Sequence, residues 1–226
     1  MSRLFPNKYS GNNKRAENDQ YFTPSQPVWA FCLELEQHLF RPFLPKNVLD
    51  PCAGTGVWGQ TWKSLYGTHR LYGMDIDDTL EKPEGYDGWQ NGDFLTSEVG
   101  NFKADLIISN PPFNQAEAFV HRAHEVANEY ATIAFLLPLA FMSTIGRFGR
   151  LYNTYDKRPS NIIVSSRRID FTGQGNPHTE VAMFVWTNES WEARTQISWI
   201  DWKNAEKDEY FKWLKGDLKC KEKELD

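Results

Sequence analysis

The chain has 226 residues, which is long enough to bury a complete hydrophobic core without disulfides or a structural metal. Its hydrophobic content of 40% and charged content of 24% are typical of a globular domain, and its aromatic content of 15% excludes a wholly disordered chain. The formal net charge of −5 argues against a protein that holds nucleic acid by overall positive charge, although a local basic face is compatible with it.

The cysteines and the apolar runs indicate in which cellular compartment the protein is found. Cys32, Cys52 and Cys220 are odd in number and form no Cys-x-x-Cys pair, so we expect a reducing cytoplasm, no disulfide frame and no metal site. The longest apolar run, 133–142, is interrupted by Pro138 and has about half the length of a membrane span. The N-terminal residues lack the apolar core of a signal peptide. We therefore expect a cytoplasmic protein without a membrane partner.

Strand and helix patterns alternate along the chain. Polar residues 1–20 predict a flexible arm, and a helix is predicted to begin at Ser25, with Pro27 in its first turn, and to end at Pro42. The further predicted elements are strands at 47–50, 69–74, just before Asp93, 104–109, 131–138, 161–165 and 180–187, and helices at 57–65 and 114–129.

This alternation predicts an α/β fold of the doubly wound type. We expect a seven-stranded, mostly parallel sheet with helices on both faces and one antiparallel strand near the C-terminus. The predicted organisation is the arm, a single domain at 21–187, and a segment at 188–226 that covers the domain with a strand or helix and ends in a charged tail.

A glycine-rich turn joins the first predicted strand to the next helix. Gly54 and Gly56 can adopt positive φ and let a ligand lie against the backbone, while free N–H groups at the helix start favour an anionic or polar atom. Asp75 follows the next strand, where a carboxylate can accept both hydroxyls of a ribose. This half of the chain is therefore predicted to bind an adenosine-containing small molecule.

Two further interpretations of this turn stay open. Gly54, Gly56 and Gly59, with Asp75 about 20 residues later, also match the NAD-binding fingerprint. The other interpretation is a glycine turn in an α/β protein that binds no ligand there. Asp50 favours a third interpretation, in which the turn binds S-adenosylmethionine. A carboxylate at the end of the first strand suits the ammonium group of S-adenosylmethionine, whereas it would repel the pyrophosphate of NAD.

The tetrad Asn110-Pro-Pro-Phe113 follows a later strand. Its prolines hold a rigid turn. The amide oxygen of Asn110 and the carbonyl of Pro111 could accept the two N–H bonds of an amino group on a planar ring, and Phe113 could stack on that ring. Such acceptors would direct the nitrogen lone pair towards a methyl donor. The alternative is a rigid turn with a core phenylalanine.

Together these motifs resemble the class I S-adenosylmethionine-dependent N6-adenine DNA methyltransferases, especially the short forms of phages and prophages, over about residues 19–187. The resemblance implies a class I methyltransferase fold in a bacterial cytoplasm and S-adenosylmethionine as cofactor, with S-adenosylhomocysteine as product. It assigns cofactor binding to Tyr21, Phe22, Thr23, Pro24, Asp50, Pro51, Cys52, Ala53, Gly54, Thr55, Gly56, Asp75, Ile76, Asp93, Phe94 and Asn110, and catalysis to Asn110, Pro111, Pro112 and Phe113.

A local excess of positive charge suggests where nucleic acid could bind. The cations are Arg147, Arg150, Lys157, Arg158, Arg167 and Arg168. The loop residues Asn176 and His178 could touch a base. An ordinary solvated surface and a plain turn are the respective alternatives.

The expected function is methyl transfer to the N6 amino group of adenine in DNA, on a base that is flipped out or already single-stranded. About 55 residues separate Gly54 from Asn110, which leaves no room there for a separate recognition domain. Three alternatives stay open. They are an RNA-adenine methyltransferase, a protein-glutamine methyltransferase, since related enzymes with Asn-Pro-Pro-Tyr methylate that side chain, and a non-catalytic remnant that binds nucleic acid or a partner.

Overall fold

The computed structural model describes residues 23–39, 44–100, 102–153, 157–173, 175, 177–187 and 194–204. The predicted arm and the end of the chain from residue 205 lie outside them. The helices and helical turns are α1 (Ser25–Gln37), α2 (Val57–Tyr66), α3 (Ala116–Val126), η2 (Leu139–Met142), α4 (Ile145–Arg147) and η3 (Phe148–Tyr152). The strands are β1 (Asn47–Asp50), β2 (Arg70–Asp75), β3 (Gly88–Asn91), β4 (Ala104–Ser109), β5 (Ala127–Pro138), β6 (Asn161–Ser165), β7 (Val181–Trp186) and β8 (Gln196–Ile200).

All eight strands form one sheet in the order β3-β2-β1-β4-β5-β7-β6-β8. β7 runs antiparallel to both its neighbours, and every other described pair is parallel, which confirms the predicted α/β class and its single reversed strand. The predicted count of seven strands is wrong. β8, from the expected covering segment, pairs in parallel with β6 and extends the same sheet.

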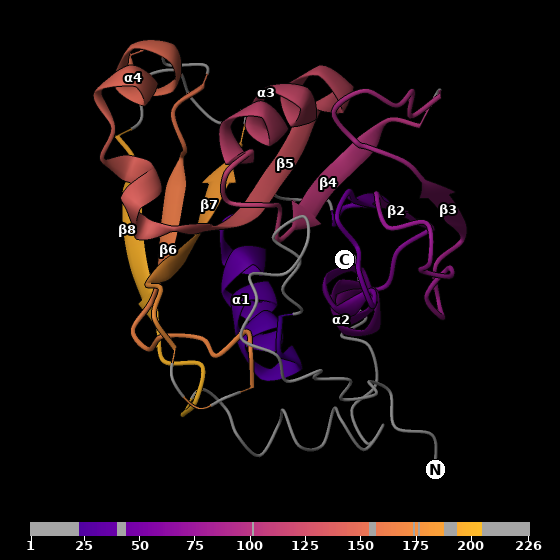
Figure 1. Ribbon diagram of the computed structural model, residues 1–226, viewed down its shortest axis with the longest axis horizontal. Helices are drawn as coiled ribbons and strands as arrows, with labels where there is room; N and C mark the ends of the chain where they lie inside the picture. Colours follow the sequence, from indigo (N-terminus) through magenta and orange to yellow (C-terminus); the bar gives the residue numbers. More distant parts are fainter. Residues whose placement is uncertain are drawn as a thin grey trace, which may run out of the picture.

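Helices cover both faces of this sheet. α1 and α2 lie on one face, and α3 with α4 and the turns around it lies on the other (Figure 1). Val48 and Leu106 belong to the core under α1 and α2, whereas their neighbours Leu49 and Ile107 belong to the opposite core, because successive strand residues point to opposite faces. None of the described helices has the length and apolar character that crossing a membrane needs.

The helix predicted for 114–129 ends earlier than the sequence suggests. Its apolar spacing is helical, but Ala127 pairs with Ala104 on β4, and the register then shifts before Leu106 pairs with Thr132. Asn128 supports this early start of β5, because its Nδ2 donates to the Asp105 carboxylate at 2.5 Å. A cross-strand pairing therefore overrides the local helical pattern.

The strand order reverses between β1 and β4, which lie side by side at the centre of the sheet. Connections from these two strands leave in opposite directions, so a crevice opens beyond their carboxyl ends, where open α/β sheets bind ligands. β1 ends at Asp50 and β4 at Ser109, so both predicted motifs, the glycine-rich turn and the Asn110–Phe113 turn, begin at this point.

Candidate active site

A cavity of about 730 Å³ lies at this reversal of the strand order. Among the residues predicted to bind the cofactor or to act in catalysis, those that line it are Thr23, Pro51, Cys52, Ala53, Gly54, Thr55, Asp75, Ile76, Asp93, Phe94, Asn110, Pro111, Pro112 and Phe113. Pro24, Asp50 and Gly56 are described but do not line it. Tyr21 and Phe22 lie outside the described residues. The structure thus brings most of both motifs to one cavity, although their roles stay predictions.

The glycine-rich turn is closed by hydrogen bonds from its own backbone. Gly54 has a φ of 52°, and its N–H donates to Asp75 Oδ2 at 2.8 Å. The other oxygen, Oδ1, accepts the amide of Asp77 at 3.0 Å. Asp75 therefore ties the turn to the end of β2, and burial raises the pKa of its carboxyl.

Asp50 does not line the cavity but lies behind its wall, and its interaction with the ammonium group of a cofactor stays a prediction. Its carboxylate is completely buried and accepts three hydrogen bonds from within the protein. Ser109 Oγ donates to Oδ1 at 2.7 Å, and Tyr86 Oη at 2.7 Å and the Gly59 amide at 3.3 Å donate to Oδ2. Burial raises the pKa of Asp50 to about 6, and these three hydrogen bonds oppose the rise.

Gly56 has the expected positive φ, and its lack of a side chain has a second reason. Its φ is 85°, which favours glycine, but the space beside its Cα is taken by protein and not by a ligand. A Cβ there would lie 2.6 Å from Pro83 and 2.9 Å from the Tyr86 ring. A Cβ at Gly59 would likewise meet Tyr86. These glycines therefore admit Tyr86, a residue that no sequence pattern singled out.

The Asn110–Phe113 turn contains an acceptor without a donor. Asn110 Nδ2 donates to Thr23 Oγ1 at 3.1 Å, but Asn110 Oδ1 is buried and has no hydrogen-bond partner among the described residues. The Pro112 carbonyl accepts the Gln115 amide at 3.0 Å, which closes the turn. Buried polar atoms are rarely left unpaired, so Oδ1 is suited to a donor on a ligand.

Two aromatic contacts shape the rest of the wall. The Phe113 ring meets Phe171 edge-on, with centroids 6.4 Å apart and planes at 81°. Phe94 is buried against Phe119, with centroids 5.4 Å apart, beside Asp93, whose carboxylate accepts the Leu95 amide at 2.9 Å.

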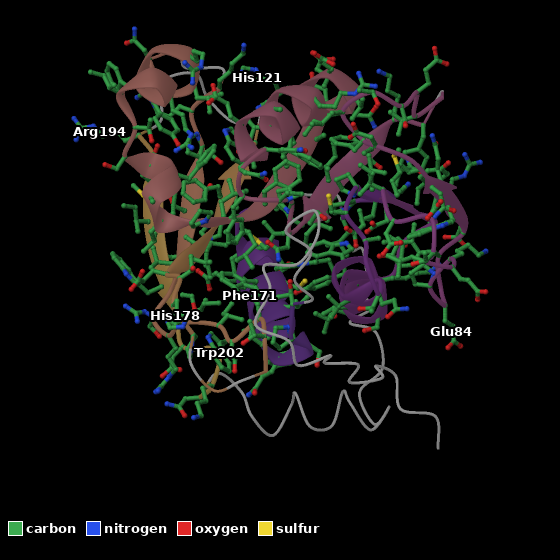
Figure 2. All side chains as sticks on the ribbon, viewed as in Figure 1. Glu84, His121, Phe171, His178, Arg194 and Trp202 are labelled. Carbon is green, nitrogen blue, oxygen red and sulfur yellow. The ribbon has the colours of Figure 1, made fainter. Side chains whose placement is uncertain are left out.

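The loop after β6 supplies another part of the lining. Asp170 holds it by accepting the amides of Thr172, Gly173 and Gly175, and His178 lines the cavity next to it. Figure 2 shows Phe171 and His178 in the same part of the view. Asn176 lies outside the described residues.

None of the six predicted nucleic-acid cations lines the cavity. The five arginines are engaged within the protein: Arg147 and Arg150 contact Glu117, Arg158 donates to the Tyr152 carbonyl, Arg167 pairs with Asp201, and Arg168 pairs with Glu180. For Lys157, the backbone carbonyl accepts the Trp186 indole N–H at 2.9 Å. Binding of nucleic acid by these arginines stays a prediction.

The described lining of the cavity carries acidic groups but no lysine or arginine. Asp75, Asp93 and Asp170 belong to it, and His178 is its one histidine. Sequence reasoning missed Trp58 and Gln115, which line the cavity from the first turn of α2 and the start of α3. Among the described residues no group of three or more His, Cys, Asp or Glu side chains could hold a metal ion.

No protein-family model matches the chain. The type II methyltransferase M.CvrRI of Paramecium bursaria Chlorella virus XZ-6E is 31% identical over 119 residues, which are 50% of this chain and 30% of that protein. The chain thus covers less than a third of this curated relative. This match supports the resemblance to DNA methyltransferases that the motifs carry.

Solved structures share the fold. The M protein of the type I restriction enzyme EcoKI has a TM-score of 0.55 at 17% identity, over 74% of this chain and 44% of its own. A type I restriction–modification methyltransferase subunit of Streptococcus thermophilus has a TM-score of 0.58 at 12% identity, over 75% and 45%. A Pyrococcus horikoshii protein provisionally described as an RNA methyltransferase has a TM-score of 0.57 at 18% identity, over 80% and 92%. At these identities the matches show the class I methyltransferase fold alone.

Proposed function

We propose that the chain transfers a methyl group from S-adenosylmethionine to the N6 amino group of adenine in DNA. The observation that carries the proposal is the buried, unpartnered Oδ1 of Asn110 in the wall of the cavity. Leaving a buried acceptor unpaired costs about 1–3 kcal/mol. An exocyclic amino group supplies the missing N–H donor, and the Pro111 carbonyl in the same wall is proposed as its second acceptor.

The charges in the cavity support S-adenosylmethionine over NAD. Asp75 and Asp93 in the wall suit ribose hydroxyls and a positively charged ligand, while the lack of lysine and arginine in the described lining disfavours a pyrophosphate. When bound, S-adenosylmethionine supplies an electrophilic methyl group on its sulfonium centre. The expected measurement is calorimetric binding of S-adenosylmethionine without binding of NAD, and the reverse result would contradict the assignment.

The protein's own part in the reaction is positioning. Asn110 accepts an N–H of the amino group and orients its lone pair, and Phe113 offers a flat face to the base. Phe113 already meets Phe171 at the cavity wall, which limits where a ring can lie. No general base is assigned, because the proton can leave for solvent after the transfer.

DNA is the proposed substrate because the curated relative is named as a type II methyltransferase and solved neighbours belong to restriction–modification systems. The target base has to leave the helix or come from a single strand, since a base within a duplex cannot reach a cavity of this kind. An RNA-adenine or a protein-glutamine substrate would use the same Asn110 acceptor, so the substrate class is decided by experiment.

The test is transfer of radiolabelled methyl to duplex DNA, single-stranded DNA, RNA and protein, followed by nucleoside and amino-acid analysis. We expect N6-methyladenine in DNA, and Asn110→Ala should abolish turnover while the cofactor Kd changes less than about threefold. Label in RNA or on glutamine would replace the DNA proposal by that substrate. Normal turnover of Asn110→Ala would make the tetrad a structural turn only.

A further inference from the structure

The Asp50 carboxylate connects three segments that the sequence separates. Asp50 is the last residue of β1 and precedes the glycine-rich turn. Ser109 is the last residue of β4 and precedes Asn110, and Tyr86 lies in the loop between β2 and β3. Ser109 acts at both sides, because its Oγ donates to Asp50 and accepts the Cys52 amide at 3.2 Å. The two motifs of the site are thus joined directly behind the cavity wall.

The loop that carries Tyr86 is itself fixed to α2 and β2. Gln60 Nε2 donates to the Glu84 carbonyl at 2.7 Å, and Lys63 Nζ donates to the Gly85 carbonyl at 2.8 Å. Asp87 accepts the Leu71 amide at 2.7 Å. These contacts hold the loop from both sides, so the buried Tyr86 hydroxyl is directed at Asp50.

We propose that Tyr86, Asp50 and Ser109 form a positioning network that fixes the glycine-rich turn and the Asn110–Phe113 turn relative to each other. The inference rests on the proposed function, because methyl transfer requires a cofactor held by one turn and an amino group held by the other. Misplacement of reacting groups by about 1 Å can cost about a hundredfold in rate. None of the three side chains needs to touch the cofactor or the substrate.

Ser109→Ala tests the link between the two turns. It removes the hydroxyl that joins Asp50 to the Cys52 amide and changes nothing that lines the cavity. We expect kcat to fall about tenfold or more, while the cofactor Kd changes less than about threefold. The matched control is Ser160→Ala, just before β6. It removes a hydroxyl that donates to the Val185 carbonyl on β7, and it should leave kcat unchanged.

Tyr86→Phe tests the third member and keeps the packed ring. Without the hydroxyl donor the Asp50 carboxylate is harder to ionise, so the acid limb of the kcat/KM profile should move to higher pH by about half a unit or more. Tyr72→Phe is the control, because its hydroxyl contacts Gln90 and not Asp50.

Three other titratable groups interact with the Asp50 carboxylate: Cys32 on α1, Cys52 in the glycine-rich turn and Asp75 at the end of β2. The experiment therefore has to show that the acid limb of the profile belongs to Asp50. In the Asp50→Asn background the shift caused by Tyr86→Phe should disappear. Loss of cofactor binding together with kcat in Ser109→Ala would overturn the network. So would a normal kcat in Ser109→Ala combined with an unmoved acid limb in Tyr86→Phe. Failure of the wild-type chain to transfer methyl groups would instead overturn the proposed function, and the inference with it.

Discussion

The carboxyl group of Asp50 is fully buried, and no cation pairs with it among the described residues. Taking a charge out of water disfavours the ionised form, which is why burial raises the pKa of Asp50 to about 6 from 3.8. The hydrogen bonds from Ser109 and Tyr86 stabilise the carboxylate but do not cancel this effect. Folding and ionisation at this residue are therefore linked.

The sign of that linkage gives a prediction for Asp50→Asn. A carboxyl whose pKa is higher in the folded chain favours folding when protonated, so its stabilisation is complete below about pH 4 and is lost as the pH rises through about 6. The variant stays neutral. The difference in unfolding free energy between wild type and variant should change by about 2 kcal/mol between pH 4 and 7 in urea titrations. Parallel stability curves over this range would contradict the ionisation of Asp50.

Single residues also show what the sequence can reveal about the site. The Asn110–Phe113 turn could be predicted because its prolines and its place after an apolar strand are local features. Tyr86 could not, because it acts on Asp50, 36 residues away, and nothing in its own neighbourhood marks it. The burial of Asp50 behind the cavity wall could not be predicted for the same reason, since its hydrogen-bond donors come from other segments.

Secondary-structure elements were predictable where their apolar pattern was strong. β1 and β4 are buried over most of their length and have adjacent apolar residues at their centres, whereas the end of α3 depends on a pairing between Ala127 and Ala104. The packing of β2 also depends on another segment, the loop that carries Tyr86. Gly73 lies within it, and the Tyr86 ring occupies the space beside its Cα.

Gly73→Ala should therefore destabilise the protein. The new Cβ would lie 2.6 Å and 2.7 Å from two Tyr86 ring carbons and 2.9 Å from Trp89, in a region where neither ring can move freely. Overpacking of this kind costs about 1–3 kcal/mol, measured by urea denaturation. Gly149→Ala is the control, because a Cβ there meets nothing within 4 Å, and equal effects of the two changes would refute the packing argument.

The whole molecule depends on contacts that no local pattern encodes. The order β3-β2-β1-β4-β5-β7-β6-β8 places β8 beside β6, and the turn after β8 supplies Asp201 as a partner for Arg167. The α/β class followed from the alternation of elements, but the eighth strand did not, because its pairing is set by a distant edge of the sheet. Among the arginines predicted for nucleic acid, Arg167 is paired for this reason.

Pairing of these arginines gives the last prediction, on nucleic-acid binding. Arg167 donates to Asp201 at 2.6 Å and 2.9 Å, and Arg168 Nε donates to Glu180 at 2.7 Å, beside the loop that lines the cavity. Each carboxylate offsets the positive charge that its arginine would offer to a phosphate. Asp201→Asn and Glu180→Gln should each strengthen DNA binding and steepen the slope of log K against log salt by up to about 0.9, the value for one phosphate contact.

Fluorescence anisotropy with a labelled duplex over a series of salt concentrations measures this slope. Glu84→Gln is the matched control, because it makes the same change of net charge elsewhere. Figure 2 shows Glu84 well apart from Trp202, whose indole N–H donates to the Arg167 carbonyl. If all three variants steepened the slope equally, net charge alone would govern binding. If Asp201→Asn and Glu180→Gln left affinity and slope at the wild-type values, these arginines would lie outside the DNA contact, and the loop containing His178 would have to hold the substrate by other groups.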